Sequence, residues 1–69
     1  MNEVKLNAKQ RQYIARFLMI EEQIKDYKQV RNNYAFNLAL MLLDDRGYLI
    51  SDYAEAVAQF INDYRKGKR

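Results

Sequence analysis

The most constraining feature of this chain is a run of ten residues, 34–43, in which Asn37 is the only strongly polar side chain. A surface helix needs one apolar stripe, so a helix that is apolar nearly all round needs cover on most of its sides. A chain below about 70–80 residues has little core with which to provide that cover. We therefore expect part of the cover to come from another chain.

The composition argues against an enzyme. The 69 residues include neither Cys nor His, which removes disulfides, thiolate chemistry and the usual zinc ligands. Ser51 is the only Ser or Thr, a helix cap explains it, and a Ser nucleophile would need a base beside it. We expect no catalytic residue, no cofactor, no metal site and no small-molecule substrate.

The apolar run is also too short to cross a membrane, because a spanning helix needs roughly 18 or more apolar residues. Residues 1–5 are not followed by the apolar segment of a secretory signal. We expect a cytoplasmic protein that makes no membrane contact.

The N-terminal part of the chain shows helical spacing. Asn7 is a candidate N-cap, and no Pro or Gly interrupts the chain before Gly47. Apolar residues then recur at steps of three and four, as on one face of a helix. They are Tyr13, Phe17, Ile20, Ile24 and Tyr27.

Two arrangements fit this pattern. In the first, one straight or kinked helix runs from Asn7 to Leu43, is about 55 Å long, and requires a partner chain. In the second, Asn32 and Asn33 form a short turn, since Asn tolerates the left-handed conformation, and the chain folds into a compact three-helix bundle. The two alternatives share an all-α fold.

The second segment should end close to Leu43. Asp44 and Asp45 would oppose the helix dipole at a C-terminus, so we expect the helix to stop before them. Gly47 is then expected to serve as a turn residue.

The last helix has the clearest pattern. Ser51 or Asp52 is its expected N-cap, Asp52 and Glu55 have the spacing of a capping box, and Gly67 is its expected stop. Its apolar face is formed by Tyr53, Val57, Phe60, Ile61 and Tyr64.

These patterns predict a single all-α domain, residues 1–69. It is a small bundle of two or three helices, in which a long or kinked N-terminal helix is joined to a short amphipathic C-terminal helix and the fold is completed by oligomerisation. Residues 1–6 are expected to be a flexible N-terminus and residues 66–69 a basic tail.

Aromatic side chains suggest where another protein would bind. The chain has six Tyr and three Phe, and Tyr is enriched at protein interfaces. A core role is the competing interpretation for each of them. The candidate interface residues in and around the apolar run are Tyr27, Tyr34, Phe36, Leu40, Leu43 and Tyr48.

Basic side chains suggest a second kind of partner. The net charge is +3, and cations gather on one stripe of the first helix and at the C-terminus. Such cations suit phosphate contacts, although ordinary solvation of the surface explains them too. The candidate phosphate contacts are Lys5, Lys9, Arg16, Arg65, Lys66, Lys68 and Arg69.

Three hypotheses for function follow. The first is a non-enzymatic protein-interaction module that self-associates, with a dimer favoured, and acts as an adaptor, regulator or inhibitor of a larger partner. The second is a small nucleic-acid-binding regulator that uses the basic N-terminal stripe and tail. The third is a phage or mobile-element inhibitor of a host nucleic-acid enzyme.

Overall fold

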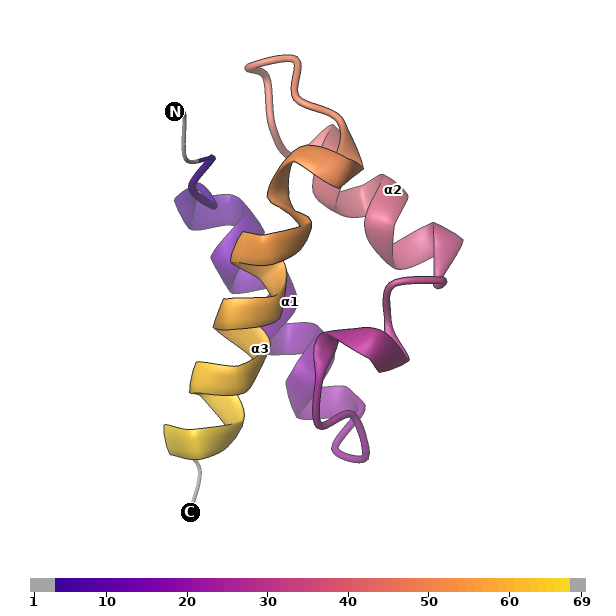
Figure 1. Cartoon of the computed structure of the whole chain (residues 1–69), viewed down its shortest axis with the longest axis vertical. Helices are drawn as coiled ribbons and strands as arrows, with labels where there is room; N and C mark the ends of the chain where they lie inside the picture. Colours follow the sequence, from indigo (N-terminus) through magenta and orange to yellow (C-terminus); the bar gives the residue numbers. More distant parts are fainter. Residues whose placement is uncertain (1–3, 68–69) are drawn as a thin grey trace.

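Three helices and two short 3₁₀ turns make up the computed structural model, which describes residues 4–67 (Figure 1). The expected all-α fold is confirmed, and no strand occurs within the described part of the chain. In chain order the elements are α1 (Ala8–Ile20), η1 (Tyr27–Gln29), α2 (Tyr34–Leu42), η2 (Ile50–Tyr53) and α3 (Ala54–Gly67).

Helix α1 begins as predicted and ends much earlier than either arrangement required. The Asn7 side chain accepts a hydrogen bond from the backbone N–H of Gln10 (2.8 Å), and the Gln10 side chain accepts one from the N–H of Asn7 (3.0 Å). This reciprocal pair is a capping box. The helix stops at Ile20, so the single helix from Asn7 to Leu43 is wrong. The longest dimension of the molecule is 34 Å, well short of the expected rod.

A side chain of α3 contacts the C-terminal end of α1. The Arg65 guanidinium donates hydrogen bonds to the backbone carbonyls of Leu18 (3.0 Å), Glu21 (2.8 Å) and Ile24. Carbonyls at a helix C-terminus carry partial negative charge and have no partner within the helix. A cation from a distant part of the sequence therefore stabilises the end of α1.

The turn before α2 differs from the predicted left-handed Asn pair. Asn33 has a φ of −81° and acts as the N-cap of α2, its side chain accepting from the N–H of Phe36 (3.0 Å). Among the described residues only Gly47 has a positive φ. The three-helix alternative is thus closer to the structure, but residues 21–33 form a long connection rather than a short turn.

The end of α2 follows the prediction, whereas the start of α3 does not. Helix α2 ends at Leu42, and Gly47 adopts a φ of +87° in the loop that follows, as a turn glycine should. Ser51 and Asp52 lie within η2 and do not cap α3. Asp52 instead accepts from the N–H of Leu49 (2.7 Å), one turn earlier than predicted.

The core is shared by all these elements, with α3 crossing in front of α1 and α2 lying to one side in Figure 1. Phe36 of α2 packs against the rings of Tyr13 (5.6 Å between centroids) and Phe17 (4.5 Å). Leu6 is 8% exposed and belongs to the core, so the predicted flexible N-terminus does not extend to this residue. The other buried apolar residues are Ile14, Leu18, Val30, Leu40, Tyr53, Val57 and Ile61.

Within residues 4–67, no helix combines the length and the apolar character needed to cross a membrane.

Candidate protein-interaction surface

Helix α2 differs from an ordinary surface helix because its strongly polar side chain is buried and its solvent-facing side is apolar. Its buried side carries Phe36, Asn37 and Leu40, which are 1%, 5% and 0% exposed. Asn37 is the one polar side chain of this helix, so the polar group of α2 lies inside the protein. A surface helix ordinarily places its polar side chains towards water.

The buried Asn37 holds the preceding turn against α2. Its side-chain NH₂ lies within hydrogen-bond distance of the carbonyls of Val30 (3.2 Å), Arg31 (3.0 Å) and Asn33 (2.8 Å). The Val30 and Asn33 carbonyls also accept backbone N–H groups, so the Asn37 side chain is the added donor for the Arg31 carbonyl. The position of Arg31 at the N-terminal end of α2 is fixed by this contact.

The opposite side of α2 is apolar and faces solvent. Tyr34 is 76% exposed and Leu42 is 73% exposed. Ala35 is also exposed, and Leu38 and Met41 are partly exposed. At 3.6 residues per turn these five side chains lie within an arc of about 120°. We call this surface, Tyr34, Ala35, Leu38, Met41 and Leu42, the outer face of α2.

Opposite charges lie just beyond the two ends of the outer face. Arg31 precedes α2, Asp45 follows it, and both are exposed. Neither side chain forms a hydrogen bond or an ion pair with the rest of residues 4–67. Arg31 does act electrostatically on Tyr27: burial raises the pKa of the Tyr27 hydroxyl, and the Arg31 charge lowers it by a smaller amount.

A groove borders the C-terminal end of the outer face. It has a volume of about 450 Å³ and lies between the start of α1 and the end of α2. Its lining combines apolar side chains with polar and charged ones. The lining residues are Asn7, Ala8, Lys9, Leu42, Leu43 and Asp45.

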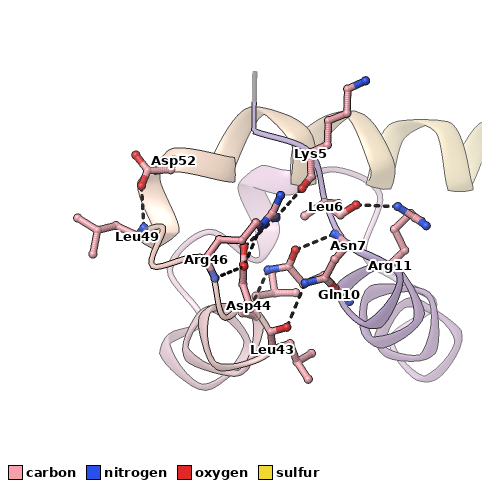
Figure 2. Close-up of polar contacts among 11 residues, drawn as sticks. Lys5, Leu6, Asn7, Gln10, Arg11, Leu43, Asp44, Arg46, Leu49 and Asp52 are labelled. Atoms are coloured by element: carbon pink, nitrogen blue, oxygen red, sulfur yellow. Dashed lines mark hydrogen bonds and ion pairs between the residues drawn. The ribbon is translucent and has the colours of Figure 1, made fainter. Parts of the chain in front are cut away.

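Side chains at the start of α1 contact the C-terminal end of α2 (Figure 2). Asn7 Nδ2 donates to the Leu43 carbonyl (3.0 Å), and Gln10 Nε2 donates to the Leu40 carbonyl (2.9 Å). Carbonyls at the C-terminus of a helix need such donors. The end of α2 is therefore held rigidly against the start of α1.

Arg46 closes the loop that follows. Its guanidinium pairs with Asp44 (2.8 Å) and donates to the Lys5 carbonyl (2.7 Å), as Figure 2 shows. The hydrogen bonds from Arg46 hold the pKa of the Asp44 carboxyl below its usual value. This pair leaves Asp45 as the free carboxylate at this end of α2.

The structure divides the predicted interface residues into three groups. Tyr34 is exposed on the outer face, whereas Tyr27, Leu43 and Tyr48 are half-buried. Phe36 and Leu40 lie in the core and cannot reach a partner. Sequence analysis missed Leu38 and its neighbours on the outer face because the run is apolar on all sides. The burial of Asn37 in the structure identifies the buried side of α2 and, opposite to it, the solvent-facing side.

The structure describes five of the seven predicted phosphate contacts. Lys9, Arg16 and Lys66 are exposed, but Lys5 precedes α1 and so is not part of a helical stripe. Arg65 is occupied by the three carbonyls at the end of α1 and lies over the Tyr64 ring (5.5 Å to the centroid). Lys68 and Arg69 lie outside the described residues.

Among residues 4–67, no group of three or more acidic side chains is arranged to hold a metal ion.

Comparisons of the chain with protein-family models, with curated proteins and with solved structures gave no match.

Proposed function

We propose that this protein is a non-enzymatic protein-interaction module that binds another protein through the outer face of α2. One observation carries the proposal: α2 buries its only polar side chain and presents an unbroken apolar face to solvent. Contiguous apolar surface of this kind marks interaction sites on monomeric proteins.

The outer face has the composition of an interface centre. It contains no charged side chain, and charges flank it at Arg31 and Asp45. An apolar centre with a polar rim is the usual anatomy of a protein interface. Tyr34 is its best anchor, because an exposed Tyr adds a large apolar area together with a hydroxyl that can form a hydrogen bond.

The most exposed side chains of this surface can contribute to the free energy of binding. Burying a large apolar side chain stabilises a complex by about 1.5–3 kcal/mol. Tyr34 and Leu42 are each about three-quarters exposed, so burying either one in a complex would provide most of the value for a single side chain. With such a surface the protein would act by bridging or covering other proteins, as an adaptor, a regulator or an inhibitor.

Site-specific photo-cross-linking tests this proposal. A photoreactive benzoylphenylalanine replaces Tyr34 in the expressed protein, and a matched variant carries it at Asn62, which is exposed on α3. We expect a protein adduct from position 34 and none from position 62. The adduct should disappear when Leu38→Asp and Leu42→Asp are added.

The mass of the adduct identifies the partner. An adduct near twice the 8.3 kDa mass indicates a second copy, and a heavier adduct indicates the larger partner of an adaptor or inhibitor. Equal adducts from positions 34 and 62 would contradict the proposal. Adducts that survive the two Leu→Asp changes would also contradict it.

A further inference from the structure

The outer face of α2 and its two flanks are arranged symmetrically about Leu38. Tyr34 and Leu42 each lie four residues from Leu38, one before it and one after it. Ala35 and Met41 each lie three residues away. Beyond the helix the same relation holds for charge, because Arg31 and Asp45 each lie seven residues from Leu38.

Such a pattern is self-complementary when two helices run in opposite directions. A two-fold axis at Leu38 brings each residue before Leu38 level with the residue equally far after it in the other copy. Tyr34 then lies level with the partner's Leu42, and the small Ala35 lies level with the larger side chain of the partner's Met41. Arg31 and Asp45 lie just beyond opposite ends of α2, so each end of the pair brings an Arg31 and the partner's Asp45 to the same side.

We propose that the occupant of the outer face is a second copy of this chain, docked with its α2 antiparallel about a two-fold axis at Leu38. This proposal rests on the function proposed above and names its partner. Both copies would use the same surface, as in other two-fold dimers.

Charge decides the direction of the two helices. In the antiparallel pair, Arg31 meets a carboxylate at each end, and the helix dipoles oppose each other favourably. In a parallel pair, Arg31 would lie beside the partner's Arg31 and Asp45 beside the partner's Asp45, which is repulsive. Both charged side chains lack a partner within residues 4–67, so each is available to the second copy.

The groove at the end of α2 lies where the partner's Tyr34 would come. Leu42 forms part of its wall and is the residue level with that ring. Leu43 adds apolar wall, and Asn7 and Asp45 add polar groups within the same lining. Tyr34 is 76% exposed in its own chain, so docking would bury a ring that the monomer leaves in water.

The size of the outer face limits the expected affinity of the dimer. Helix α2 has nine residues and a length of about 14 Å. A stable dimer usually buries about 800 Å² on each partner, and one face of a helix of this length offers less than that. We therefore expect a reversible dimer with a dissociation constant in the micromolar range, in which the end charges contribute measurably.

Charge reversal tests the direction and the register together. In sedimentation equilibrium from about 1 to 500 µM, Arg31→Asp and Asp45→Arg should each weaken the dimer about tenfold, since each replaces two attractions by repulsions. The double variant should recover the wild-type dissociation constant. Arg16→Asp, an equal charge change on the exposed side of α1, is the control and should have little effect.

A second variant tests the centre of the interface. Leu38→Asp should leave a monomer at all these concentrations, whereas Met19→Asp, at an exposed apolar position of α1, should not. Circular dichroism confirms that each variant remains helical. A dimer unaffected by Leu38→Asp, or a double charge variant without recovery, would overturn the proposal.

The same measurement separates this proposal from the function on which it rests. A wild-type chain that stays at 8.3 kDa up to 500 µM overturns the dimer. If cross-linking through position 34 to a heavier protein persists in that case, the outer face of α2 still binds a protein and only the identity of its occupant is wrong. If neither a dimer nor an adduct forms, both proposals fail.

Discussion

Helices α2 and α3 are both partly buried, but they differ in the kind of side chain that they expose to solvent. Helix α3 buries Val57 and Ile61 and exposes polar side chains such as Glu55 and Asn62. Helix α2 buries Asn37 and exposes Tyr34. The difference shows that α3 places its polar side chains in solvent, whereas α2 leaves an apolar face exposed.

The largest expected effect is a difference in stability between substitutions on the buried and the outer side of α2. Leu40→Ala should destabilise the protein by about 2–5 kcal/mol, because it leaves a cavity at a fully buried position. Leu42→Ala, on the outer face, should change the stability of the monomer by less than about 0.5 kcal/mol. Chemical denaturation at a concentration well below that of self-association measures both.

A chain of this size rarely has more than about 3–5 kcal/mol of stability, so the loss expected from Leu40→Ala is a large fraction of the whole. Equal losses from Leu40→Ala and Leu42→Ala would mean that the monomer already covers the outer face of α2. The contrast with α3 would then disappear.

The next effect concerns the reversed polarity of α2. Asn37→Ala should cost about 2 kcal/mol, since the Arg31 carbonyl loses its side-chain donor and the Val30 and Asn33 carbonyls lose their second one. Asn62→Ala on the exposed side of α3 is the matched change and should stay within about 0.5 kcal/mol. Thermal unfolding of the two variants compares them, and similar melting temperatures would contradict the structural role of Asn37.

A smaller effect tests whether α3 ends α1. Arg65→Met keeps the apolar stem but removes the donors to the C-terminal carbonyls of α1, and it should cost about 1–2 kcal/mol. Lys66→Met, which is exposed, is the control. Amide hydrogen exchange should show faster exchange near Glu21 in the first variant alone. Unchanged exchange there would show that α1 ends without this contact.

The smallest effect is a pH dependence just beyond α2. The lowered pKa of Asp44 means that the folded state favours its ionised form. Its contribution to stability is present above about pH 4 and is lost as the pH falls through the lowered pKa. The stability of Asp44→Asn and Arg46→Gln should therefore fall less steeply between pH 5 and 2 than that of the wild type. An acid limb as steep as the wild type in both variants would contradict the pairing.

The sequence predicted the features that depend on local chemistry. The cap at Asn7, the end of α2 before Asp44, the turn at Gly47 and the apolar face of α3 follow from neighbouring residues. The break after Ile20 does not, because its stabilising cation is Arg65, more than forty residues away. Local propensity alone allows a helix to continue there.

The candidate surface was predicted less well than the fold for a related reason. The sequence of an amphipathic helix such as α3 indicates which side is buried, because apolar and polar residues alternate at helical spacing. The apolar run of α2 gives no such indication. The sequence indicated that some of this run would lack cover, and it identified Tyr34. It also assigned Phe36 and Leu40 to the interface, although the rings of α1 and the core occupy that side.

An isotope-filtered NOE experiment on an equimolar mixture of labelled and unlabelled chain tests the central claim most directly. Tyr34 and Leu42 lie eight residues apart on α2, about 12 Å along the helix, so one chain cannot give an NOE between the Tyr34 ring and the Leu42 methyl groups. We predict intermolecular NOEs between these two side chains. Intermolecular NOEs confined to α3, or none at millimolar concentration, would contradict the docking of a second copy on the outer face of α2.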